Sequence, residues 1–260
     1  MTIENIIIKD LSKRFASSSG FSIKDLIGSI LDLDINVYVV GGATRDWLQN
    51  IPANDIDLVV DDDITYVYEH CKKIFNESNL SFFNNIGLLK IKGELADVDI
   101  NIMRNEADTK KIWEESNYSP IKEIEMDYLN RDFSINCFYY NCRTKTFHNP
   151  VEGARKDLSK RLLRIVTGPT KMKYDQRICL RILKFMSQGY FASKETLKVL
   201  EKRFEDDILT FDGFAKWLSI TVTPGDGNYK SFKHLALKQN VSKLALMKLE
   251  AMFEEIEQSS

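Results

Sequence analysis

A pair of glycines and, a short distance further along the chain, a pair of aspartates have residue types and spacing that suit phosphate chemistry. Gly41 and Gly42 follow a β-branched run, and glycine lets the backbone come close to a phosphate. A helix that begins directly after such a turn points its N–H groups at an anion, and Arg45 would add a forked cation. The pattern predicts a phosphate-binding turn, with an ordinary turn as the alternative.

Asp55 and Asp57 lie two positions apart on a predicted strand, so their side chains share one face. Two such carboxylates repel each other unless a hard cation lies between them, and Mg²⁺ prefers oxygen ligands. Two ions about 3.5–4 Å apart could activate a hydroxyl and stabilise a leaving pyrophosphate. Asp99, or else Asp97, would supply a third carboxylate, which makes Asp55, Asp57 and Asp99 the candidate catalytic set. The alternative is a solvated strand edge.

Charge is unevenly distributed along the chain. Residues 1–110 hold 11 lysines and arginines against 18 acidic residues, whereas residues 143–203 hold 16 against 5. Within the basic stretch, Arg177, Arg181 and Lys184 are spaced to share one helix face. An acidic first part and a basic later part favour metal chemistry beside an anionic partner. A solvated helix face and uneven surface charge are the alternatives.

Hydrophobic periodicity predicts the elements that position these residues. We expect helices over 22–33, 43–48 and 64–75, strands over 35–40, 55–60, 86–92 and 96–102, and a hairpin over 137–148. Further helices are expected over 175–187, 194–205, 210–221 and 228–256. The order of elements predicts an α+β protein, with an α/β head over 1–165 that contains a mostly buried sheet and an all-helical segment over 166–260.

The composition is that of an ordinary globular chain. It has 260 residues, 43% hydrophobic and 28% charged, with a net charge of −2, which excludes a basic coat over the whole chain. The apolar runs are far shorter than the roughly 20 residues that span a bilayer, and no signal peptide is apparent. The four cysteines and three histidines form no zinc-binding pattern. We therefore expect a reduced, cytoplasmic protein without a membrane span.

Five ordered segments contain these candidate residues together with further polar motifs. They are Gly41–Asp46, Asp55–Asp57, Asn130–Asn136, Gly153 with Asp157–Arg164, and Asp175–Phe185. Together they resemble the motifs of the tRNA nucleotidyltransferase/poly(A) polymerase family, the class II branch of the polymerase-beta-like nucleotidyltransferases. The resemblance implies a polymerase-beta-like head with a mixed sheet, followed by a helical neck.

The resemblance also implies roles for individual residues. Asp55 and Asp57 would ligate Mg²⁺, and Asp175 would pair with the edge of the incoming base. The implied nucleotide-binding residues are Gly41, Gly42, Arg45, Arg131, Asp132, Asn136, Asp175, Arg181 and Lys184.

The sequence departs from the family pattern at three positions. Asn130 replaces the first arginine of the third motif, and Tyr174 replaces the glutamate of the fifth. Ile178 replaces the arginine that would pair with the base, and isoleucine cannot donate a hydrogen bond. The usual selection of C and then A is therefore in question, and Arg177 could substitute only if the helix rotates or shifts.

These features predict an RNA 3′-terminal nucleotidyltransferase that transfers AMP, CMP or both from ATP or CTP to the tRNA 3′ end, with Mg²⁺ as cofactor. The chain ends where the family's neck region would end, so its body and tail domains are expected to be absent. A partner subunit or an oligomer would then replace the tail. Two alternatives are a nucleotidyltransferase of the same fold that modifies a protein or small molecule, and a non-enzymatic nucleotide- or RNA-binding module.

Overall fold

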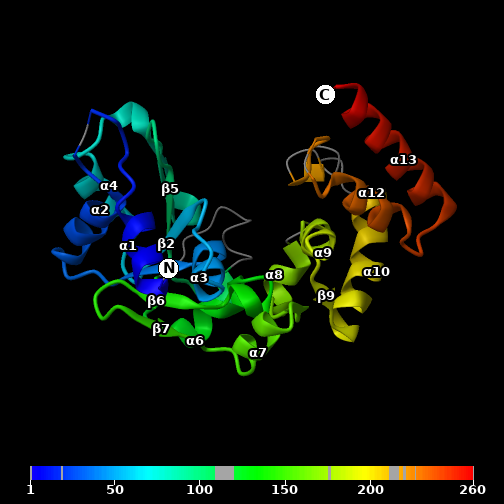
Figure 1. Ribbon diagram of the computed structural model, residues 1–260, viewed down its shortest axis with the longest axis horizontal. Coiled ribbons are helices and arrows are strands. Elements are labelled where there is room, and N and C mark those ends of the chain that lie inside the picture. The colour runs from blue at the N-terminus through cyan, green and yellow to red at the C-terminus, as the bar shows by residue number, and fades with distance from the viewer. Residues whose placement is uncertain are drawn as a thin grey trace. The chain divides into compact units, whose positions relative to one another are not determined.

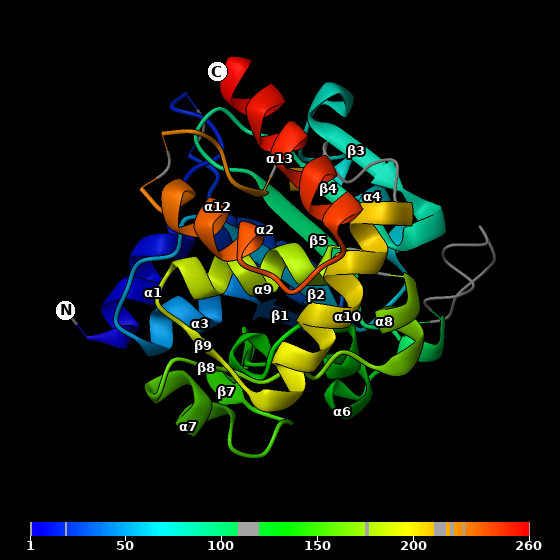
Figure 2. The same cartoon turned by 90° about the vertical axis from the view of Figure 1, so that its right-hand side faces the viewer.

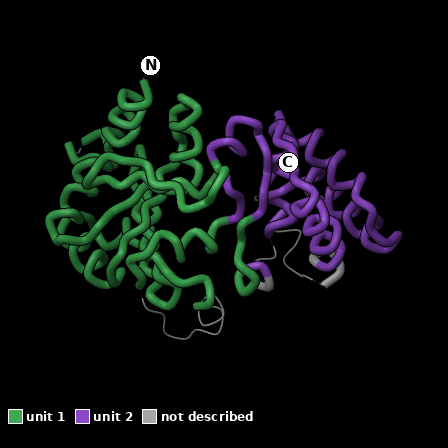
Figure 3. Tube along the Cα trace, turned by 90° about the horizontal axis from the view of Figure 1, so that it is seen from below, with its two compact units in different colours: residues 1–131, 135–154, 166–171 green, residues 132–134, 155–165, 172–260 purple. Residues whose placement is uncertain are grey.

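The computed structural model divides into two compact units that are interleaved along the chain (Figure 3). The first comprises residues 1–131, 135–154 and 166–171, and the second comprises residues 132–134, 155–165 and 172–260. The structure describes residues 2–18, 20–108, 120–174, 177–210, 217–218, 221–225 and 227–259. The expected head over 1–165 and neck over 166–260 stay a prediction. Across the described ranges, no helix has the length and apolar composition to cross a bilayer.

The first unit is built on a mixed seven-stranded sheet, which confirms the predicted α+β class. The strands are β1 (Val37–Val40), β2 (Ile56–Val60), β3 (Leu80–Phe83), β4 (Leu88–Ile91), β5 (Val98–Ile102), β6 (Tyr139–Asn141) and β7 (Thr146–His148). Their order across the sheet is β3-β4-β5-β2-β1-β6-β7. The β2–β5 pair is parallel and the other neighbouring pairs are antiparallel.

Helices cover one face of this sheet and build the main core (Figure 1). They are α1 (Ile3–Leu11), α2 (Ile23–Leu31), α3 (Gly42–Leu48) and α4 (Ile64–Cys71). The opposite face carries a smaller cluster that includes Val59, Tyr139 and Ile124 of α6 (Ile124–Asp127). Because neighbouring residues of a strand point to opposite faces, the polar residues Asp57 and Asp99 lie on the face with this smaller cluster.

Helix α1, which the sequence analysis did not predict, fixes the segment that leads to the aspartate pair. Asp10 is 1% exposed, and its Oδ2 accepts hydrogen bonds of 2.7 Å from Nε1 of Trp47 and from the backbone N of Ala53. Nζ of Lys13 donates to the carbonyl of Ala53 at 2.7 Å. The backbone N–H and carbonyl of Ala53 are thus both hydrogen-bonded, which fixes the chain two residues before Asp55.

The second unit consists mainly of helices. They are α9 (Ile178–Ser187), α10 (Lys194–Thr210), α12 (Tyr229–Leu237) and α13 (Lys243–Gln258). The residues of α7 (Ala154–Ser159) and α8 (Pro169–Tyr174) are divided between the two units. Helix α9 packs against α10 and α12, and α13 contacts both α10 and α12 (Figure 2). A short parallel pair, β8 (Leu162–Leu163) and β9 (Phe191–Ala192), accompanies the helices. Short 3-10 turns occupy Glu77–Asn79, Asn84–Ile86, Glu106–Asp108, Tyr128–Asn130 and Ser134–Asn136.

The predicted helix over 228–256 is wrong as a single element, because the chain breaks between α12 and α13. Helix α12 ends at Leu237, and Ser242 begins the next helix by accepting a hydrogen bond from the backbone N of Ala245 at 3.2 Å. Serine is a favoured N-cap because its hydroxyl satisfies a backbone donor of the first turn. Most of the predicted helix over 210–221 lies outside the described residues.

The contacts of Asp10 yield a stability prediction. Asp10→Ala leaves the buried donors of Trp47 and Ala53 without their acceptor, so the free energy of unfolding should fall by about 3 kcal/mol. Urea denaturation followed by circular dichroism measures the change. Lys9→Ala, at an exposed position of the same helix, should change stability by less than about 0.5 kcal/mol. Equal effects of the two substitutions would show that Asp10 does not anchor this segment.

Candidate active site

The glycine turn lies directly against one carboxylate of the aspartate pair. Gly41 follows β1 with a φ of 71°, a conformation that side chains with a Cβ rarely adopt. A Cβ added to Gly41 would lie 3.5 Å from Oδ2 of Asp57. The buried hydroxyl of Thr44 donates to the carbonyl oxygens of Gly41 and Phe138, each at 3.0 Å. The turn is therefore held in place beside Asp57.

Asp57 and Asp99 are register partners on the parallel strands β2 and β5, and Asp55 is exposed directly before β2. Loss of hydration raises the pKa of Asp57, and the charges of Asp99 and Asp55 raise it further. The cations Arg131 and Lys90 act in the opposite direction without reversing the shift. Asp57 is thus the centre of a carboxylate cluster, and each ionised neighbour opposes the ionisation of Asp57.

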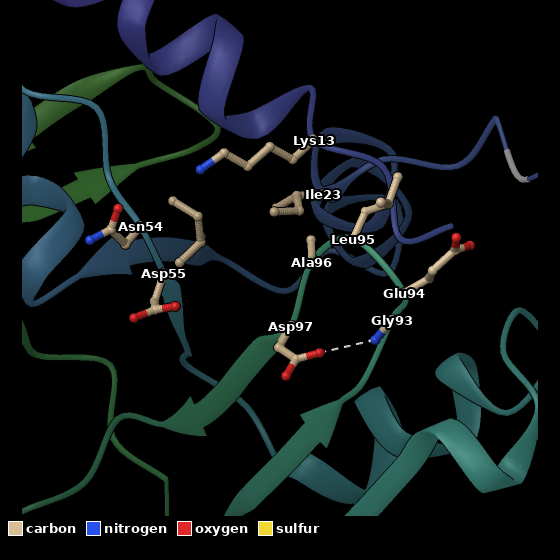
Figure 4. A pocket seen from close by; sticks show the side chains of 10 residues that line it. Lys13, Ile23, Asn54, Asp55, Gly93, Glu94, Leu95, Ala96 and Asp97 are labelled. Carbon is tan, nitrogen blue, oxygen red and sulfur yellow. Dashed lines mark hydrogen bonds between the residues drawn. The ribbon is translucent and has the colours of Figure 1, made fainter. Parts of the chain in front are cut away.

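Asp55 also lines a cavity of about 350 Å³ together with Asp97 (Figure 4). Oδ1 of Asp97 accepts a hydrogen bond from the backbone N of Gly93 at 3.1 Å, within the turn before β5. Asp97, the alternative third carboxylate, therefore lies beside this cavity. Asp99 is the residue that lies next to Asp57.

The donor chemistry of the cluster fits a divalent cation bound by a pair of carboxylates. Their mutual repulsion is what a bound cation would relieve, and carboxylate oxygens suit Mg²⁺. Oδ2 of Asp99, however, lies 2.6 Å from Nζ of Lys90. In the described part of the chain, no three His, Cys, Asp or Glu side chains gather closely enough to hold a metal ion. Asp55 and Asp57 are thus the candidate ligands, and Asp99 is paired with a lysine.

Arg45 lies at the glycine turn, and two neighbours hold its guanidinium. Its Nε and Nη2 are 2.9 and 2.7 Å from Oδ1 of Asp46, and its Nη1 donates to Oδ1 of Asn136 at 2.9 Å. A Cβ added to Gly42 would lie 3.7 Å from Nη2 of Arg45. The structure thus brings together three residues that were predicted to bind the nucleotide, Gly42, Arg45 and Asn136.

A carboxylate that the sequence analysis missed holds Arg131. Asp127 is 2% exposed, and its Oδ2 accepts hydrogen bonds from Nη2 of Arg131 at 3.0 Å and from the hydroxyl of Tyr139 at 2.6 Å. The guanidinium lies 5.4 Å from the centroid of the Tyr139 ring, and its charge lowers the pKa of Asp57. The four-residue spacing of Asp127 and Arg131 is that of a helical ion pair, and this was the available sequence signal.

Two of the positions that depart from the family pattern are buried. In the first unit, Asn130 is 7% exposed, and its amide donates to the carbonyl of Arg104 at 2.7 Å. In the second unit, Ile178 is 1% exposed and belongs to the buried side of α9. The guanidinium of Arg177 lies 5.1 Å from the centroid of the Trp217 ring, an arrangement typical of a cation–π contact. Ile178 therefore serves packing within its unit.

In the second unit, two residues that were predicted to bind the nucleotide are bonded to each other. Nε and Nη2 of Arg181 lie 2.7 and 2.5 Å from Oδ2 of Asp132, and Oδ1 of Asp132 accepts a hydrogen bond from the backbone N of Phe133 at 2.8 Å. Lys184, on the same helix as Arg181, is half-buried. Asp175 lies outside the described residues. Asp132 and Arg181 thus neutralise each other within the second unit.

The fourth motif ties two segments of the second unit together. Asp157 is 7% exposed, and its Oδ2 accepts hydrogen bonds from the hydroxyl of Ser134 at 2.7 Å and from Nε of Arg164 at 2.9 Å. The backbone N of Ser134 also donates to the carbonyl of Arg164 at 2.9 Å. Asp157 and Arg164 therefore stabilise the fold around the third motif.

The raised pKa of Asp57 predicts a pH-dependent effect on stability. A carboxyl whose pKa is raised by folding favours the folded state while it is protonated, below its ordinary pKa of about 4, and loses that contribution as the pH rises through the raised value. Asp57→Asn removes the charge, so its melting temperature should exceed that of the wild type at pH 7. The difference should shrink toward pH 4, which thermal unfolding at a series of pH values measures. A lower melting temperature of the variant at pH 7 would show that ionised Asp57 stabilises the fold.

Comparison with known proteins finds a matching family model and similar sequences. Residues 37–164 match the model of the poly(A) polymerase head domain. The CCA-adding enzyme of Listeria monocytogenes serotype 4a is 25% identical over 169 residues, which are 65% of this chain and 42% of that enzyme. The chain thus spans about two fifths of the length of the curated relatives that it matches.

Solved structures share the fold. The Bacillus stearothermophilus CCA-adding enzyme in complex with CTP aligns with a TM-score of 0.61 and 16% identity over 81% of this chain and 47% of that one. The Thermotoga maritima CCA-adding enzyme complexed with tRNA_CCA aligns with a TM-score of 0.60 and 18% identity over 98% and 54%. Through the head domain matched at residues 37–164, the comparisons support the tRNA nucleotidyltransferase/poly(A) polymerase family for this chain.

Proposed function

We propose that this chain transfers AMP, CMP or both from ATP or CTP to the 3′-hydroxyl of an RNA, and that the acceptor is the 3′ end of tRNA. The observation that carries the proposal is the close approach of the glycine turn to the carboxylate cluster. Gly41 leaves space beside Asp57, and Asp99 is the register partner of Asp57. A triphosphate on the turn would thus lie next to the carboxylates.

The aspartate pair and the glycine turn have different proposed roles in nucleotidyl transfer. Asp55 and Asp57 would hold Mg²⁺, which makes the RNA 3′-hydroxyl a better nucleophile and neutralises charge on the triphosphate. Gly41 and Gly42 let the phosphates approach the backbone, and Arg45 places a cation at the same turn for the leaving pyrophosphate. The 3′-oxygen would form a bond to the α-phosphorus, the bond to pyrophosphate would break, and the hydroxyl proton would pass to solvent.

Arg131 would supply a second cation for the nucleotide. Its side chain is 21% exposed, while Asp127 and Tyr139 fix the position of its guanidinium. Because its charge already acts on Asp57, it lies where it can also offset phosphate charge as the triphosphate binds. Fixed cations of this kind stabilise charge without reorganising during the reaction.

The relatives support tRNA and both nucleotides as substrates. The curated relatives are named as CCA-adding enzymes, and structures of the same fold are described as complexes with CTP, with a primer tRNA and an incoming ATP analog, and with tRNA_CCA. The basic stretch over 143–203 would bind the phosphates of the acceptor. A second candidate is a nucleotidyltransferase that modifies a protein or small molecule, and the burial of Ile178 favours it, since no base-reading donor stands at that position.

The acceptor can be tested directly by nucleotide transfer. The chain is incubated with α-labelled ATP or CTP, Mg²⁺ and total RNA, and the products are separated on a denaturing gel. Label in the tRNA band is the expected result. Label only on protein or on a small molecule would favour the second candidate, and nucleotide binding without any transfer would contradict both.

Substitution of the central carboxylate tests the catalytic assignment. Asp57→Asn should lower the rate of transfer at least about 100-fold. Loss of a metal ligand should have at least as large an effect as loss of a residue that hydrogen-bonds to a ligand. Thermal unfolding should still show a folded chain. Asp62→Asn is the matched control, because it removes a carboxylate from the turn after β2, and should retain the wild-type rate. Transfer at the wild-type rate by the Asp57 variant would exclude Asp57 from catalysis.

A further inference from the structure

Three adjacent strands place a lysine and two aspartates in a row across one face of the sheet. Lys90 of β4 is the register partner of Asp99 of β5, and Asp99 is the register partner of Asp57 of β2. Residues on either side of each of these three positions belong to the main core, so the three side chains share the opposite face. Nζ of Lys90 lies 2.6 Å from Oδ2 of Asp99.

No three metal-ligating side chains gather closely enough to hold an ion in the described part of the chain, and Asp99 is bonded to Lys90. A divalent ion could use an oxygen of Asp99, but this oxygen is bonded to the ammonium group of Lys90 instead. The other cation at the cluster, Arg131, is bonded to Asp127. Lys90 is 41% exposed, and its long flexible stem allows the ammonium group to move.

We propose that Lys90 is a built-in cation that competes with a divalent ion for Asp99 and weakens metal binding while no nucleotide is present. The proposal rests on the function proposed above, because it concerns the same site. The site then holds its ion through Asp55 and Asp57 alone until the negative triphosphate attracts Lys90 away from Asp99. Metal affinity of an oxygen site depends on the number of charged ligands, so this one lysine couples metal binding to nucleotide binding.

Mn²⁺ is a suitable probe, and isothermal titration of the full chain without nucleotide or RNA measures its affinity. Lys90→Met removes the charge and keeps the apolar stem, and it should tighten Mn²⁺ binding at least about 10-fold. Lys90→Arg keeps the charge and should stay near the wild type. Lys92→Met is the matched control, because Lys92 is an exposed lysine directly after the same strand, and it should change the affinity less than about twofold.

A second substitution identifies the ligand that Lys90 masks. In Lys90→Met/Asp99→Asn, the gain in Mn²⁺ affinity should disappear, because the uncovered ligand is itself removed. Thermal unfolding of each variant verifies that it is folded. An unchanged affinity in Lys90→Met, or a gain that persists in the double variant, would overturn the proposal.

This measurement is independent of the proposed transfer reaction. A chain that shows the predicted Mn²⁺ affinities but transfers no nucleotide contradicts the proposed function and leaves the role of Lys90 standing. A chain that transfers nucleotide while Lys90→Met leaves Mn²⁺ affinity unchanged contradicts the role of Lys90 alone.

Discussion

Loss of hydration at Asp57, together with the negative charges of Asp99 and Asp55, is the constraint on which the rest of the site depends. Asp55 and Asp99 both oppose the ionisation of Asp57, and a fold keeps such a cluster only at a cost in stability. Lys90 and Arg131 reduce the cost without removing it. The cluster is therefore suited to a further positive charge, and in the proposed function a divalent ion would supply that charge beside the glycine turn.

The structure around the cluster restricts where that charge can bind. Asp10 holds the segment before Asp55, Thr44 holds the turn at Gly41, and Asp127 holds Arg131. Each of these contacts is buried or nearly so, and each fixes a residue that borders the cluster. The site is thus preorganised by local hydrogen bonds at Thr44 and Asp127 and by the long-range contact of Asp10 with Ala53, and such preorganisation stabilises developing charge without reorganisation during the reaction.

Local patterns in the sequence were sufficient to predict the parts of the site that lie within single elements. The β-branched run before Gly41 and the alternation at Asp55 and Asp57 are short-range signals, and the structure has the strands that they predict. The pairing of Lys90 with Asp99 depends on strand register, which no local pattern specifies. The burial of Ile178 depends likewise on tertiary packing.

The central claim is that Asp55 and Asp57 bind a divalent ion that carries a nucleoside triphosphate seated at Gly41 and Gly42. Anomalous diffraction from crystals of the chain with Mn²⁺ and a non-hydrolysable ATP or CTP analogue tests it most directly. The account predicts a manganese peak bonded to oxygens of Asp55 and Asp57, with the phosphates against the glycine turn. A peak bonded to neither aspartate, or a nucleotide bound away from that turn, would contradict it.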